Sequence, residues 1–230
     1  MNKVFDMYRA RIYKPTDKMS DLICENYTLL QVLSRFGISL GFGDKNVSDV
    51  CRDNDVDCNT FLAVVNFLVE NSSRMLDHLD GISIPALMSY LKQSHIYYLD
   101  FQLPSIRKKL VEALENTTEK EAAFLILQFF DAYVNEVFQY VNRLLEGESS
   151  DEFKICIFAR NHEHIDTKLK ELKNIIIKYF PSGSDNFLLN ATLFDIFSCE
   201  EDLASHNKVE DFLFIPAISE LENRRKHETE

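Results

Sequence analysis

The chain has 230 residues, and its 37 Asp and Glu residues outnumber its 25 Lys and Arg residues, giving a formal net charge of −12 at pH 7. Binding to nucleic acid through phosphate contacts requires a surplus of basic residues, so this balance argues against a nucleic-acid partner and against an anionic membrane surface. The chain contains only 6 Gly and 5 Pro. Because these residues interrupt helices, their scarcity favours long helices and a helical fold.

The cysteines and the N-terminal stretch indicate the compartment. Residues 1–18 carry charges throughout and lack the apolar run of a secretory signal. The five cysteines are an odd number, at irregular spacing and without a CxxC pair, which is typical of neither a disulfide framework nor a zinc ribbon. We therefore expect a cytoplasmic protein with reduced thiols.

Short amphipathic pieces in residues 1–75 predict a small helical domain. The first apolar stripe runs from Leu22 to Leu33 and ends at a group of glycines. Asn46 and Asp57 each precede a further apolar stretch, and both are residue types that cap helix N-termini. We expect three helices in this domain, with these two residues as N-caps.

The remainder of the chain, residues 82–224, shows a longer helical period. Four runs can be drawn, separated by turn-forming residues: 84–115, 120–145, 153–179 and 186–222. Short connections between long amphipathic helices favour an up-and-down four-helix bundle. Pro104 and Pro216 lie inside the first and fourth runs, so each run is expected to be kinked or split there. The predicted fold class is therefore all-α, with the small N-terminal helical domain followed by this bundle.

Histidines on separate runs suggest a metal site. His95 lies in the first run, His162 in the third and His206 in the fourth. Glu210 follows His206 at i+4, which places both side chains on one helical face. Imidazole and carboxylate groups from separate helices of a bundle are the ligands of carboxylate-bridged iron sites. Many surface helices contain such a pair by chance, so the alternative is that these histidines are packed or solvent-facing.

Several segments together carry a family resemblance. In the long runs they are Ser94-His95 ahead of Leu103-Pro104, Asn161-His162-Glu163, and His206-Asn207-Lys208-Val209-Glu210 ahead of Ile215-Pro216. Residues 21–38 and 61–62 add a likeness in the N-terminal part. In order and spacing, over about residues 19–222, the chain resembles the hemerythrin-like di-iron proteins, and among them the bacterial proteins that repair iron centres.

The resemblance implies a cofactor, a function and partners. It implies iron, either mononuclear or di-iron, held by His95, His162, His206 and Glu210, with Tyr140 as a further candidate ligand. It implies a role in the response to iron, dioxygen or nitric-oxide stress, with iron-sulfur cluster repair in a client protein as the most specific version. It also implies a homodimer formed through the small domain.

Two departures from the family pattern limit what the resemblance implies. The His and Glu expected on the second long helix are replaced by Tyr140 and Leu144, and leucine has no ligand atom. The adjacent cysteines of the family's small domain are absent from residues 41–45. Three interpretations stay open: a di-iron site, a single-metal site that uses His162, His206 and Glu210 with His95 or Tyr140, and a metal-free bundle that acts as a regulatory or protein-interaction module. Whether the chain is an enzyme is also left open.

Overall fold

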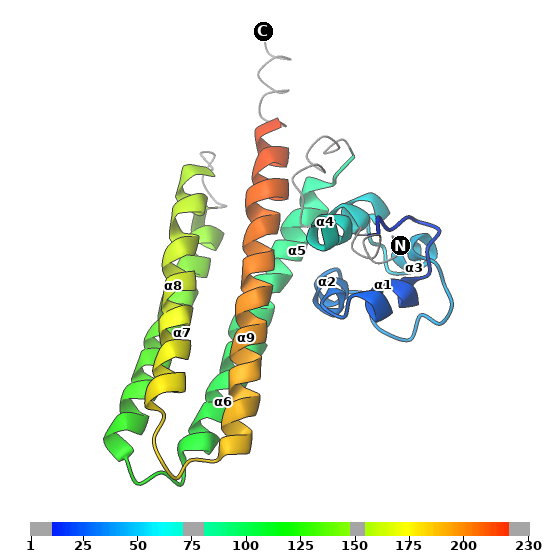
Figure 1. Ribbon diagram of the computed structural model, residues 1–230. Coiled ribbons are helices and arrows are strands. Elements are labelled where there is room, and N and C mark those ends of the chain that lie inside the picture. The colour runs from blue at the N-terminus through cyan, green and yellow to red at the C-terminus, as the bar shows by residue number, and fades with distance from the viewer. Residues whose placement is uncertain (1–10, 71–80, 148–154, 221–230) are drawn as a thin grey trace, which may run out of the picture. The chain divides into compact units, whose positions relative to one another are not determined.

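The computed structural model describes residues 11–70, 81–147 and 155–220, without the side chains of residues 70, 140–147 and 155–166. Within these ranges the regular elements are helices (Figure 1), which confirms the all-α class. Contacts divide the chain into two compact units. The first unit comprises Met1–Ser94 and Lys208–Glu230, and the second comprises His95–Asn207. The predicted domain boundary falls mostly within residues 71–80, which lie outside the described ranges, and stays a prediction.

The first unit contains short helices followed by most of a longer one. Their bounds are α1 Met19–Glu25, α2 Leu29–Arg35, α3 Val47–Asp53, α4 Cys58–Glu70 and α5 Ile84–Ile96. The apolar stripe expected to form one helix forms two, α1 and α2, because Asn26 adopts a non-helical conformation (φ −142°, ψ 89°) at the end of α1. Its side-chain amide donates to the Tyr13 hydroxyl at 2.9 Å, a competing hydrogen bond of the kind that disfavours Asn inside helices. The expectation of three helices up to residue 70 was therefore wrong.

The two predicted N-caps are confirmed. The Asn46 side-chain oxygen accepts a hydrogen bond from the backbone N–H of Asp49 at 2.8 Å. The Asp57 carboxylate accepts one from the backbone N–H of Thr60 at 2.7 Å. Each bond satisfies a donor that the first turn of its helix would otherwise leave without a partner, so α3 and α4 begin where the sequence indicates.

The second unit is built from long helical segments that share one core. It contains the π-helical turn η2 Tyr97–Gln102, α6 Leu103–Leu114, α7 Lys120–Gly147, α8 Ile155–Tyr179 and most of α9 Asn186–Val209. Buried apolar side chains come from all of these segments, among them Tyr98, Ile106, Phe130, Leu172 and Ile196. Helices α7 and α8 lie side by side in Figure 1 and make extensive contact.

Two connections of the second unit meet at one end. The Thr117 hydroxyl, between α6 and α7, donates to the Ser182 carbonyl, between α8 and α9, at 2.9 Å. The backbone N–H of Asp185 donates to the Ala113 carbonyl at 3.2 Å. Both connections lie together at this end, and each reverses the direction of the chain (Figure 1). Helix α6 therefore runs opposite to α7, and α8 runs opposite to α9.

At the two prolines predicted to kink or split helices, the helix changes its hydrogen-bond register. The turn η2 ends two residues before Pro104, and a second π-helical turn, η3 Glu210–Phe214, ends two residues before Pro216. Proline has no N–H, and its ring conflicts with the carbonyl four residues earlier, so the wider π turn accommodates it. In the described ranges, no helix combines the length and apolar character needed to cross a membrane.

Candidate metal centre

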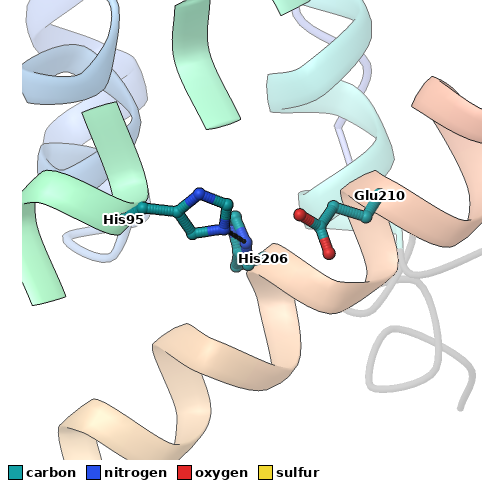
Figure 2. A group of neighbouring side chains, drawn as sticks. All are labelled: His95, His206 and Glu210. Carbon is teal, nitrogen blue, oxygen red and sulfur yellow. Dashed lines mark hydrogen bonds between the residues drawn. The ribbon is translucent and has the colours of Figure 1, made fainter. Parts of the chain in front are cut away.

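Two histidines and a glutamate lie close together in the structure (Figure 2). His95 is in the last turn of α5, His206 is in α9, and Glu210 opens η3. The Nε2 atoms of His95 and His206 are 3.1 Å apart. The two rings meet edge to face, with centroids 4.9 Å apart and an interplanar angle of 70°. The imidazole groups therefore direct the same nitrogen toward a common point.

The Glu210 carboxylate belongs to the same cluster because of its place in the helix. It follows His206 by one turn, and its side chain projects from the same side of the helix (Figure 2). One ligand atom from each of the three residues lies within 4.8 Å of the others. The i+4 pair predicted from the sequence is therefore joined by a histidine from another helix.

The low solvent exposure of this cluster distinguishes it from a group of side chains on the protein surface. His206 is 1% exposed and Glu210 is 0% exposed, whereas His95 is half-buried. The buried ring of Tyr98 stands edge-on to His206, with centroids 5.9 Å apart. Solvent therefore reaches the cluster chiefly on the side of His95.

The arrangement fits a transition-metal ion. Two nitrogen ligands that share one ion, each bonded at about 2.1 Å, stand about 3.0–3.4 Å apart, which includes the observed 3.1 Å. Two imidazoles and one carboxylate form the donor set of non-haem iron sites that keep open coordination positions. A divalent cation is also a favourable neighbour for a carboxylate removed from solvent. Without metal, the same histidine contact is a hydrogen bond in which one ring donates and the other accepts.

The structure brings together three of the five predicted ligands. His95, His206 and Glu210 form the cluster. Tyr140 is on α7 and His162 is on α8, but their side chains lie outside the described residues. Their predicted ligand roles therefore stay predictions.

An internal repeat that was not among the predicted features surrounds the two clustered histidines. Residues 94–104 and 205–216 each begin with Ser-His, contain Asp-Phe starting five residues after the histidine, and end with an aliphatic residue and Pro. In this alignment Leu99 corresponds to Glu210, four residues after each histidine. The repeat would have paired His95 with His206 from sequence alone. It also shows why one copy supplies a histidine and a carboxylate while the other supplies only a histidine.

The π turns were a second missed feature. Both lie within the repeat, and Glu210 is itself the first residue of η3. Such turns occur frequently at functional sites because an extra residue changes which side chains face a partner. The sequence signal for both turns is the proline near the end of each copy, which predicts a kink or a break in the helix without specifying a π turn.

The three clustered side chains are the basis for assigning a function. No protein-family model, curated protein or solved structure matches the chain. The geometry of His95, His206 and Glu210 is therefore the structural feature that bears on function.

Proposed function

We propose that the chain is a hemerythrin-like protein that holds one divalent transition-metal ion, iron in the first instance, at His95, His206 and Glu210. The observation that carries the proposal is the contact of two imidazole nitrogens at 3.1 Å beside a buried carboxylate. Nitrogen and oxygen ligands in this ratio suit iron, and they leave coordination positions open.

The open positions connect the site to a role in stress. A ferrous ion held by three protein ligands supplies a binding position for a small molecule such as dioxygen or nitric oxide. The burial of His206 and Glu210 limits the approach of water to the ion. This chemistry supports a role in sensing or handling iron and small oxidants, with iron-sulfur cluster repair on a client protein as its most specific form.

Thermal unfolding under nitrogen, with and without ferrous iron, tests the site. A ligand that binds only the folded state raises its stability by about 2.7 kcal/mol at one hundred times its dissociation constant. We expect iron to raise the melting temperature of the wild-type protein. The increase should be lost in Glu210→Gln, which keeps the size of the side chain but removes its charge, and in His206→Ala.

Glu171→Gln is the matched control, because Glu171 is exposed on α8. It should retain the wild-type increase in melting temperature. An equal increase in the wild type and in Glu210→Gln would show that iron binds elsewhere, and no increase in the wild type would reject the site.

A second candidate, the protein-interaction module, is favoured by exposed aromatic residues on α9. Phe187 is 91% exposed and Phe194 is 73% exposed, and their seven-residue spacing places them on one face of the helix. Exposed apolar groups that gather on one face mark interaction surfaces. If this face pairs two chains, the wild-type protein sediments as a dimer, and Phe187→Ser/Phe194→Ser sediments as a monomer. A monomeric wild type would remove the support for pairing through this face.

A further inference from the structure

The two π turns share a hydrogen-bond pattern, and in each of them a proline directly follows the residue that closes the turn. The residue before each proline donates its backbone N–H five residues back: Leu103 to the Tyr98 carbonyl, and Ile215 to the Glu210 carbonyl. In an α-helix these bonds would reach four residues back. Each proline therefore directly follows the residue whose backbone N–H closes a π turn.

The η2 turn sets the face on which His95 lies. Buried positions along this continuous helical segment are separated by three or four residues at Leu91, Ser94 and Tyr98, and again at Leu103, Ile106 and Leu110. Between Tyr98 and Leu103 the interval is five residues. The π turn absorbs this extra residue, so the buried positions before and after it remain aligned.

An uninterrupted α-helix would lose this alignment. Each residue of an α-helix advances by about 100° around the axis. With Leu103, Ile106 and Leu110 held in the core of the second unit, closing the π turn into an α-helix would rotate His95 and Tyr98 by that angle. His95 would then no longer direct its Nε2 atom toward His206.

The η3 turn acts on Glu210 more directly. The Glu210 carbonyl is the acceptor of the π-type bond from Ile215. The backbone of this candidate ligand is therefore fixed by the turn that ends before Pro216. One π turn follows His95 and the other begins at Glu210, so each adjoins a candidate ligand.

We propose that Pro104 and Pro216 are positioning residues for the metal centre: each favours the π turn that orients a ligand, His95 in one case and Glu210 in the other. Alanine at either position restores the N–H and removes the ring, so the α-helical register competes with the π turn. The proposal rests on the proposed function, because it assumes that the cluster binds metal.

Cobalt(II) titration of the purified chain, followed by visible absorption, tests the proposal. Residues that orient ligands without touching the metal typically change its affinity roughly 10- to 100-fold when substituted. We expect Pro104→Ala and Pro216→Ala to weaken cobalt binding by a factor in this range and to shift the absorption bands, because ligand geometry changes. Pro85→Ala is the matched control, since Pro85 is exposed in the first turn of α5, the helix that carries His95.

A rescue variant separates positioning from a general loss of stability. Phe101 lies in η2 and is 62% exposed, so its deletion removes the extra residue at little cost to the core. Deletion of Phe101 combined with Pro104→Ala shortens the interval from Tyr98 to Leu103 to that of an α-helix. This variant should regain the affinity that Pro104→Ala loses. It also provides the test if Pro104→Ala alone does not fold.

The outcomes distinguish this proposal from the proposed function. Unchanged affinity and spectrum in Pro104→Ala and Pro216→Ala, with normal cobalt binding by the wild type, would overturn the positioning role alone. A folded deletion variant that does not bind cobalt would also overturn it. Absence of cobalt binding by the wild type would overturn the proposed function and the positioning role together.

Discussion

Glu210 shows how much of the candidate site depends on single residues. It is fully buried, it lies one turn after His206, and its carbonyl accepts the bond that closes η3. The corresponding residue of the other repeat copy is Leu99, which packs against the core of the second unit. One substitution between the copies therefore decides whether a carboxylate or an apolar side chain follows the histidine.

Tyr13 is a buried residue whose ionisation opposes folding. Burial, followed by its hydrogen bond to the Glu25 carboxylate, raises the pKa of Tyr13 from 10.0 to about 12. Its contribution to stability is present below pH 10 and is lost as the pH rises toward 12, because the unfolded state releases the proton first. We expect the free energy of unfolding to fall across this interval.

Tyr13→Phe removes this contribution, so its free energy of unfolding should decline less between pH 10 and pH 12. Urea denaturation at several pH values measures the difference. Cys51, whose pKa burial raises to about 12, is present in both proteins, so the comparison isolates the tyrosine. Parallel declines in the two proteins would contradict the assignment.

The predictions for single residues are confirmed where they depend on interactions between residues close in sequence. Asn46 and Asp57 were identified as caps because a cap bonds to a backbone group three residues away. The pairing of His206 with Glu210 follows from the helical period alone. The contact between His95 and His206 joins residues 111 positions apart, and helical periodicity contains no information about it.

At the scale of the element, helix α3 depends on its cap. It has only 7 residues, and the Asn46 side chain bonds to its first turn. Replacement of a capping Asn by Ala typically costs about 1 kcal/mol. We expect Asn46→Ala to lower the free energy of unfolding by about that amount, measured by urea denaturation.

Asn46→Asp is the control, since aspartate caps as well as asparagine does. It should keep most of the wild-type stability. Equal losses in the two variants would show that Asn46 stabilises the chain by something other than capping.

Some elements were predicted more accurately than others. The long runs were found close to their observed bounds because amphipathic periodicity over many turns is a strong signal. The division between α1 and α2 was missed, because apolar spacing continues across Asn26 while its side chain bonds to Tyr13. The π turns were missed because a proline indicates an interruption of a helix without specifying its type. The five-residue step from Tyr98 to Leu103 that marks η2 is visible only once burial is known.

At the scale of the whole molecule, the two connections at one end of the second unit are tied by Glu119. Its carboxylate accepts hydrogen bonds from the Ser182 hydroxyl and from the Ser182 backbone N–H, the latter at 3.0 Å. These bonds, the hydroxyl's first, hold the pKa of Glu119 below its ordinary value of 4.5. The contribution to stability is therefore present above pH 4.5 and is lost as the pH falls below it.

Glu119→Gln should consequently unfold with a weaker dependence on pH than the wild type below pH 4.5. Thermal unfolding monitored by circular dichroism at pH 3 to 6 measures the difference. Glu171→Gln, an exposed glutamate on α8, should follow the wild-type curve. If Glu119→Gln also follows it, the two connections are held together by other contacts.

The most direct test of the metal centre is the iron content of the chain. Protein purified without oxygen or chelator, loaded with ferrous iron and passed through gel filtration, is analysed for iron and for protein. We predict about one iron per wild-type chain, and loss of that iron in His206→Ala/Glu210→Gln. Wild-type protein that retains no iron, or a variant that retains as much as the wild type, would contradict the assignment of His95, His206 and Glu210 as a metal centre.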